Sequence, residues 1–179
     1  MGQANEPQDV WPEGETALVT LFRHNLWANL RLLDTCAALD AAQLDEAVTG
    51  TYGAIYDTLN HLVRAEQGYL IQLTGRYPEL RLRRTDRPSL DTLRAQARLS
   101  GVGLMTVAGT IAPSAMATWE DENGRWAIAA GVVLTQAINH ATEHRAQIAT
   151  TLTQIGVTPP GMDGWVFGYP YATLTPNES

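Results

Sequence analysis

Apolar residues recur every three or four positions in four stretches of the chain, which is the spacing of an amphipathic helix. The stretches are residues 15–39, about 53–73, about 89–107 and about 130–155. In the first stretch the repeated apolar positions are Leu18, Leu21, Phe22, Leu26, Leu30, Leu33 and Ala37. We therefore expect four long helices and an all-α fold class.

Signals for helix ends flank three of these stretches. Thr51 is a plausible cap for the second helix, Ser89 opens the third, and Gly156 ends the fourth. The third stretch also contains three glycines, each of which costs about 1 kcal/mol against alanine in a helix. These are Gly101, Gly103 and Gly109. They argue against a helix there, whereas the apolar spacing favours one.

A short β-hairpin is predicted between the third and fourth helices. Asn123 and Gly124 lie between flanks that carry Trp119 and Trp126, and an Asn-Gly pair favours a type I′ turn. Four helices with two connections longer than a hairpin turn favour a four-helix bundle with at least one crossover connection. The tail after the last helix is rich in Gly, Pro and aromatic residues, and we expect it to pack across the bundle.

Length and charge narrow the class of protein. The 179 residues, 45% of them hydrophobic, suit a single domain over 1–179 with a core at about 14–163 and two tails. The net charge of -7 opposes binding to nucleic acid, which requires clustered Lys and Arg. No apolar run approaches the roughly 20 residues of a membrane helix, and residues 1–12 lack the pattern of a secretory signal. We therefore expect a cytoplasmic protein with no membrane partner.

One basic segment and one cysteine stand out from this background. Residues 76–87 are rich in arginine, but Tyr77, Pro78 and Glu79 interrupt the run. The segment is interpreted as a solvated link between helices rather than an anion-binding patch. Cys36 has no partner for an internal disulfide, and its apolar surroundings favour a small buried side chain over a reactive thiol.

Three of the four histidines can converge on one point. His140 and His144 are four residues apart on the last helix, which leaves their imidazoles about 40° apart and one turn from each other. His61, on a flank of small residues of the second helix, could supply a third imidazole. Three such ligands would leave a fourth metal position open for water or substrate, as in catalytic sites.

Spacing alone leaves a rival interpretation open. A histidine on a helix flank is more often a surface residue or a hydrogen-bonded core residue than a metal ligand. His24, near Thr20 and Arg31 on the first helix, is given that structural interpretation. The pair of His140 and His144 makes the metal interpretation as plausible as the structural one.

Two charged residues fall at the centre of apolar helix faces. Glu66 lies in the stripe of the second helix and Arg145 in that of the fourth. Because an unpaired buried charge is very costly, we hypothesise a buried ion pair between them. The alternative is that Arg145 binds a substrate carboxylate. For Asn25 and Asn29, buried hydrogen bonding between helices is favoured over lining the site.

Three segments of the chain resemble the DinB-like (DinB/YfiT) family. They are residues 25–33, 58–66 and 139–148, and the most specific feature is one histidine on the second helix with two, four apart, on the last. The resemblance implies a metal-binding four-helix bundle with up-down-down-up topology, often a homodimer. Where the family often has glycine, this chain has Ala146.

The same resemblance implies a chemistry. His61, His140 and His144 would hold a divalent metal, zinc or nickel and possibly iron. Characterised relatives are transferases and isomerases that use a low-molecular-weight thiol cosubstrate with a small-molecule substrate. A metal-bound thiol would ionise at neutral pH and attack an electrophile.

Two other functions stay open at this point. Residues His140 to His144 match the H-x-x-E-H pattern of inverzincin peptidases, in which Glu143 would be the general base, although a solvated Glu143 is favoured. Those enzymes need a downstream carboxylate ligand, and only Asp163 and Glu178 follow. A wider metal-dependent hydrolase and a non-catalytic module that binds a metal or small ligand are the remaining alternatives.

Overall fold

The computed structural model describes residues 11–172; residues 1–10, part of the stretch expected not to be a secretory signal, and 173–179, with Glu178, lie outside it. The chain is mostly helical with one small antiparallel sheet. In order, the elements are α1 (Ala17–Cys36), α2 (Ala41–Leu44), α3 (Ile55–Thr74), α4 (Leu90–Thr110), β1 (Met116–Asp121), β2 (Gly124–Ala129), α5 (Ala130–Gln154), α6 (Gly164–Gly168) and the 3-10 turn η1 (Tyr169–Tyr171).

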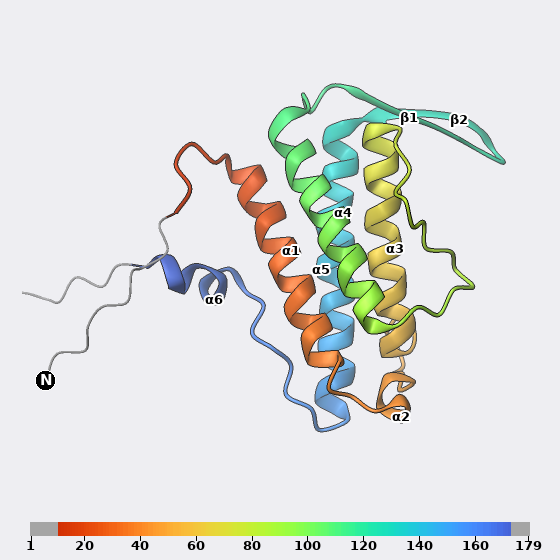
Figure 1. Ribbon diagram of the computed structural model, residues 1–179, viewed down its shortest axis with the longest axis vertical. Helices are drawn as coiled ribbons and strands as arrows, with labels where there is room; N and C mark the ends of the chain where they lie inside the picture. Colours follow the sequence, from red (N-terminus) through yellow and green to blue (C-terminus); the bar gives the residue numbers. More distant parts are fainter. Residues whose placement is uncertain (1–10, 173–179) are drawn as a thin grey trace, which may run out of the picture.

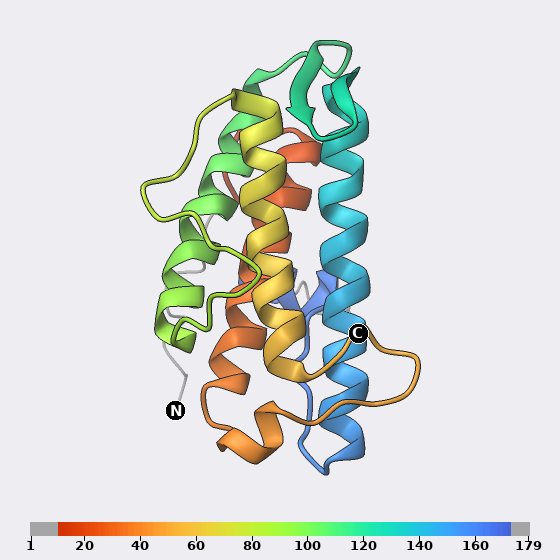
Figure 2. The ribbon, with the colours of Figure 1, turned by 90° about the vertical axis from the view of Figure 1, so that its right-hand side faces the viewer.

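The four long helices α1, α3, α4 and α5 lie side by side (Figures 1 and 2). Helix α1 packs against α4 and α5, and α3 packs against the same two helices. The colours of Figure 1 show that α1 and α5 run in one direction and that α3 and α4 run in the other. The described part of the chain has six α-helices where the sequence predicted four, because the short α2 and α6 were not expected.

The helix boundaries follow local hydrogen bonding with one departure from prediction. The Ser89 side chain accepts a hydrogen bond from Thr92 N and caps α4, as predicted. Thr51 does not cap α3, because its hydroxyl donates to Val48 O in the preceding turn and the helix begins four residues later. Gly156, with φ of 78°, follows the end of α5 in the left-handed conformation typical of a helix terminus.

The glycines of α4 are explained by close contact between helices. A Cβ at Gly101 would lie 2.6 Å from Leu26 Cδ1 of α1, and one at Gly103 would lie 2.6 Å from Leu70 Cδ2 of α3. Leucine side chains thus occupy the space that larger residues would need. The glycines lower the helix propensity of α4 but allow α1 and α3 to pack closely against it. The apolar periodicity of α4 alone could not reveal this packing.

The predicted hairpin is present, but its turn differs. Strands β1 and β2 pair antiparallel, with Trp119 opposite Trp126. Asp121 pairs with Gly124, so two residues, Glu122 and Asn123, form the turn. A type I′ turn needs positive φ at both central residues, and no non-glycine residue in the described part has positive φ. The type I′ prediction was therefore wrong.

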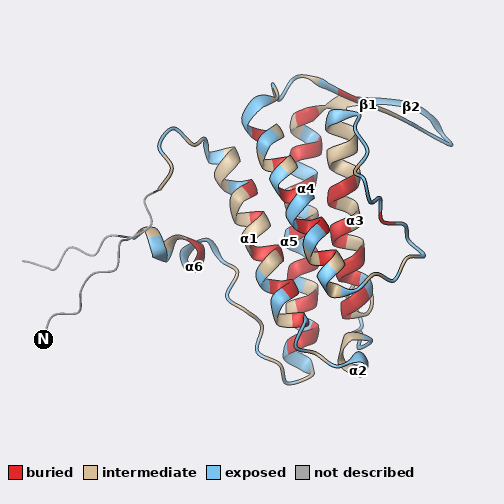
Figure 3. Cartoon of the chain, in the orientation of Figure 1, coloured by how far each residue is buried: buried red, intermediate tan, exposed pale blue. Residues whose placement is uncertain are grey.

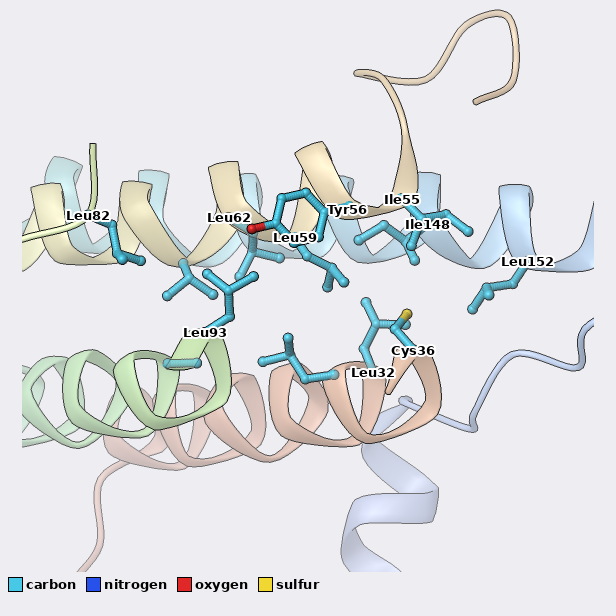
Figure 4. Packing of buried hydrophobic residues seen from close by; sticks show 13 residues of the cluster. Leu32, Cys36, Ile55, Tyr56, Leu59, Leu62, Leu82, Leu93, Ile148 and Leu152 are labelled. Carbon is cyan, nitrogen blue, oxygen red and sulfur yellow. The ribbon is translucent and has the colours of Figure 1, made fainter. Parts of the chain in front are cut away.

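Buried side chains gather between the four long helices (Figure 3). They form two apolar clusters. The larger includes Leu32, Leu59, Leu93, Ile148 and Leu152 (Figure 4), and the smaller includes Phe22, Leu104, Ala108, Leu134 and Ala137. In the tail, α6 buries Phe167 against Trp27 of α1. Within the described residues, no helix combines the length and the hydropathy needed to cross a membrane.

Candidate metal centre

The structure brings His61 of α3 together with His140 and His144 of α5. His61 Nε2 lies 2.9 Å from His140 Nε2, and His144 Nε2 lies 3.2 Å from the same atom. One ring nitrogen from each residue lies within 4.8 Å of the others. The cluster forms because α3 and α5 pack against each other with these histidines on facing flanks.

Second partners of the rings determine which nitrogens carry protons. His144 Nδ1 lies 2.8 Å from Gln147 Oε1, an acceptor, so Nδ1 donates and Nε2 keeps its lone pair. His61 Nδ1 lies 3.2 Å from Arg64 Nη2, a donor, so Nδ1 accepts and Nε2 carries the proton. His140 Nε2 therefore faces one hydrogen-bond donor, His61 Nε2, and one acceptor, His144 Nε2.

His140 cannot satisfy both neighbours. If its Nε2 is unprotonated, it accepts from His61 but faces the lone pair of His144 at 3.2 Å. If it is protonated, it donates to His144 but opposes the N–H of His61 at 2.9 Å. Its Nδ1 is buried and has no hydrogen-bond partner among the described residues. A cation between three unprotonated Nε2 atoms removes both conflicts.

The spacing fits such a cation. Zn–N bonds of about 2.0–2.1 Å in tetrahedral geometry place ligand nitrogens about 3.3 Å apart. Two of the three separations, 2.9 and 3.2 Å, need only a small expansion to reach that value, and all three ligand nitrogens lie within 4.8 Å of one another. The three-histidine cluster is therefore compatible with binding a divalent metal.

Burial keeps two of the imidazoles neutral. Loss of solvent lowers the pKa of His61 to about 4, helped by the neighbouring His140 and His144 and by Arg64 and Arg84. Burial and the proximity of His144 lower the pKa of His140 to about 4, against a smaller opposing effect of Glu143. Neutral imidazole is the form that binds metal, so both rings are ready to coordinate at neutral pH.

Acidification is expected to destabilise the metal-free protein between about pH 6.5 and about pH 4. Unfolded histidines take up protons around their ordinary pKa of 6.5, whereas folded His61 and His140 do so only near 4. The free energy of unfolding therefore falls as the pH falls. Glu66 opposes this trend, because burial raises its pKa to about 7 and its contribution declines as the pH rises. Because the two histidines together change the free energy of unfolding more than Glu66 does, the net effect of acid is destabilising.

Urea unfolding at several pH values in this range measures how steeply the free energy of unfolding changes with pH. In a double variant, His61→Gln with His140→Gln, the Glu66 contribution dominates and the slope should reverse. An unchanged slope in that variant would show that the two histidines do not cause the pH dependence.

Aromatic residues that the sequence did not indicate cover the cluster. The Tyr52 ring stacks on His61 at 4.2 Å and meets the edge of His144 at 5.1 Å. Tyr69 meets His140 edge-on at 5.7 Å. Tyr52 lies in a loop with no helical spacing to predict it. Gln147, three residues after His144, could have been found from the helical spacing that paired the histidines.

A polar layer crosses the four long helices between the two apolar clusters. Glu66 Oε1 accepts hydrogen bonds from Asn25 Nδ2 at 2.7 Å and Asn29 Nδ2 at 2.8 Å. Arg145 Nη1 donates to Asn25 Oδ1 at 2.6 Å and Asn29 Oδ1 at 2.7 Å. Ser100 of α4 completes the layer with a 3.3 Å hydrogen bond to Glu66 Oε2.

This layer corrects the predicted direct ion pair. Glu66 and Arg145 are 1% and 5% exposed, as the wheel position implied, but two asparagine amides separate them. A helical wheel gives the direction of a side chain and not its reach, so it could not place the amides between the charges. Asn25 and Asn29 make the predicted buried hydrogen bonds between helices. Within the described part, no hydrogen bond joins these four residues to the three histidines.

Other candidates have structural or solvent contacts. His24 Nε2 lies 2.8 Å from Met162 O, and its ring packs against Phe167. Cys36 is fully buried, and burial raises the pKa of its thiol to about 12. Glu143 is exposed and accepts from Gln147. The Asp163 carboxylate caps α6, so it is not a fourth ligand of the cluster.

Comparisons with known proteins bear on the fold and the family of the chain. A crystal structure of a DinB-like protein from Bacillus cereus ATCC 10987 is similar, with a TM-score of 0.62 and 19% identity over 80% of this chain and 94% of that one. At that identity the likeness supports the fold alone. No curated protein matches the chain. The model of the DinB family matches residues 1–174, and the chain therefore belongs to the DinB family.

Proposed function

We propose that this protein is a metal-dependent enzyme that transfers a low-molecular-weight thiol to an electrophilic small molecule. The observation that carries the proposal is the meeting of three Nε2 atoms whose protons cannot be arranged without conflict. Three neutral imidazoles suit zinc, and they also suit nickel or iron. A divalent cation held there would lower the pKa of a thiol beside it and so supply thiolate at neutral pH.

The open ligand set favours a catalytic site over a structural one. Among the described residues, no Cys, Asp or Glu joins the three histidines in the cluster. Structural zinc sites usually close with four protein ligands, whereas catalytic sites keep a position for substrate. This contrast supports an enzyme over a non-catalytic metal-binding module.

The chain's own side chains would prepare the site. Gln147 holds the His144 ring with Nε2 directed at the cluster, and its Oε1 also accepts from Tyr52 N at 3.2 Å. Tyr52 thereby stays stacked on His61 and shields one face of that ring from water. Such outer partners fix the orientation of metal ligands and raise their basicity.

The nucleophile would come from the cosubstrate. Cys36 is buried in the apolar core and its thiol has a pKa of about 12, so it cannot serve as a thiolate at neutral pH. Peptidase chemistry is less well supported, because its general base and its carboxylate ligand are both engaged elsewhere. Glu143 is exposed and bonded to Gln147, and Asp163 caps α6. A thiol bound from solution fits these observations.

The proposal also includes the topology of the helix bundle and the number of chains in the assembly. We take α1, α3, α4 and α5 to be the up-down-down-up bundle implied by the family, with the crossover between α3 and α4. The homodimer implied by the family stays a prediction, which light scattering of the purified protein would test.

A turnover assay tests the proposed function. Zinc- or nickel-loaded protein is expected to accelerate the reaction of glutathione with an aromatic electrophile, and the His140→Ala variant is expected to lose this activity. The His24→Ala variant, which removes a histidine outside the cluster, should retain it. Turnover that survives the loss of bound metal would contradict the mechanism while leaving the metal site intact.

A further inference from the structure

A wide pocket lies next to the metal centre and contains none of its three histidines. It is an open pocket of about 970 Å³ between α3 and residues 79–86 of the segment that joins α3 to α4. Arg64, Gly68 and Ile71 line it from α3. These residues share the helical face of His61, since they follow it by three, seven and ten positions.

The charge of this pocket is opposite to that of the protein. Four arginines line it, Arg64, Arg81, Arg83 and Arg84, against two acidic residues, in a chain of net charge -7. In the described part of the chain none of the four forms an ion pair, although three other arginines do. Asp86 is engaged by the backbone, since its Oδ2 accepts from Arg83 N at 2.7 Å. Arg64 contacts His61 and Arg81 lies over the Tyr77 ring, but no carboxylate of the described residues forms an ion pair with the four guanidinium groups, so their charge is available to an external anion.

The outer wall of the pocket is anchored to the helices. Buried Gln67 donates to Leu80 O at 3.0 Å and accepts from Leu82 N at 3.0 Å. Asn60 donates to Asp86 O at 2.9 Å, and the Leu82 side chain is buried in the core. The arginine-bearing segment is therefore held in place on α3, while Arg81, Arg83 and Arg84 are exposed, as the predicted solvated link requires.

Gly68 leaves room on the pocket wall. It lies in the middle of α3, where glycine costs about 1 kcal/mol against alanine. A Cβ built there would meet no protein atom within 4 Å, in contrast to Gly101 and Gly103 of α4, where leucines fill the space. Packing within the chain thus gives no reason for this glycine. Close approach of a ligand to the helix backbone gives one.

Arg64 joins the pocket to the metal centre. Its Nη2 lies 3.2 Å from His61 Nδ1, so the pocket begins at the far edge of a ring whose other nitrogen faces the cluster. A cation at Nε2 places the imidazole proton on Nδ1, which removes the acceptor that Arg64 now uses. The contact with His61 uses Nη2 alone, so Arg64 has further N–H donors for a ligand in the pocket in the metal-free chain as well.

We propose that this pocket binds the carboxylate or phosphate group of the thiol cosubstrate or the small-molecule substrate, with Arg64, Arg81 and Arg84 as its anion contacts. The guanidinium fork matches both kinds of anion in two-point geometry. The assignment to a substrate rests on the proposed function, whereas anion binding itself does not. It predicts that anionic thiols are used in preference to thiols without an acidic group.

Calorimetric titration of the metal-free full chain tests the proposal with S-methylglutathione and, separately, phenyl phosphate. S-Methylglutathione keeps the carboxylates of glutathione but has no free thiol, so its binding does not depend on metal chemistry. We expect at least one probe to bind, and Arg64→Ala to weaken that binding tenfold or more. Arg98→Ala, which removes an exposed arginine of α4, should change it less than twofold.

A second variant places a bulky apolar side chain on the pocket wall without changing the charge of the pocket. Gly68→Leu is expected to abolish binding of the same probe while the Tm stays at or above that of the parent, because the new side chain meets no protein atom near its Cβ. Which probe binds more tightly identifies carboxylate or phosphate as the preferred group. Failure of both probes to bind, or equal losses in Arg64→Ala and Arg98→Ala, would overturn the proposal.

Activity measurements separate this proposal from the proposed function. Arg64→Ala should raise KM for glutathione and leave KM for cysteamine, a thiol without a carboxylate, unchanged. If Arg64→Ala turns over with an unaltered KM for glutathione, the anion-pocket proposal is wrong and the proposed enzymatic function stands. If the probe binds but the protein shows no turnover, the anion pocket stands and the proposed enzymatic function is wrong.

Discussion

The His140→Ala variant is expected to bind a divalent cation at least a hundredfold more weakly than the parent while its helices remain intact. His140 Nε2 is the atom that both other rings approach, at 2.9 and 3.2 Å. Loss of an outer partner of a metal ligand typically weakens binding about 10–100-fold, and loss of a ligand costs more. The loss leaves His61 Nε2 and His144 Nε2 without this contact, but both contacts are only partly buried, so water can take the place of the ring.

Elemental analysis beside circular dichroism measures both parts of this result. His24→Ala is the matched control, because His24 contacts Met162 and Phe167 rather than the cluster, and it should keep one ion per chain. Gln147→Leu should fall between the two, since it releases only the His144 ring. Full metal content in His140→Ala would remove that residue from the ligand set.

Arg145→Met is expected to lower the free energy of unfolding by about 3–5 kcal/mol. In a chain of this length the Tm would fall by roughly 10 °C. The substitution removes a cation buried at 5% exposure. It leaves Asn25 Oδ1 and Asn29 Oδ1 without their donor and the Glu66 carboxylate without a buried counter-charge. Because burial already raises the pKa of Glu66 to about 7, the variant can protonate that carboxyl in mild acid. The loss should therefore be larger at alkaline than at mildly acidic pH.

Chemical unfolding of the single and double variants measures this loss and its origin. Adding Glu66→Gln to Arg145→Met should cost less than the sum of the two single changes, because no buried charge is then left alone. A Tm that is unchanged in Arg145→Met, together with a raised KM for an anionic substrate, would contradict the structural role. It would return Arg145 to the substrate-binding role that the sequence also allowed.

The long elements could be predicted because each carries a repeated apolar pattern. Helix α5 was expected over about 130–155 and spans Ala130–Gln154. The four residues of α2 and the five of α6 are too short for such a pattern. Only local capping signals could have found them, such as Asp40 and Gln43, which form a capping box around α2.

Contacts across the fold were harder to predict than directions on a helix. The wheel placed His61 and His140 on suitable flanks and Glu66 in the core. It could not show that two amides bridge Glu66 to Arg145, because that depends on how closely α1, α3 and α5 approach. The arginine-lined pocket was hidden for the same reason, since it needs residues 79–86 to fold back onto α3.

X-ray absorption spectroscopy of the zinc-loaded protein, with and without cysteamine, tests the central claim most directly. The claim predicts imidazole nitrogens at about 2.0–2.1 Å and, after the thiol is added, one new sulfur neighbour at about 2.3 Å. The same thiol should leave no sulfur signal in His140→Ala. A zinc environment that is unchanged by thiol, or that is identical in the parent and in His140→Ala, would contradict an open three-histidine site.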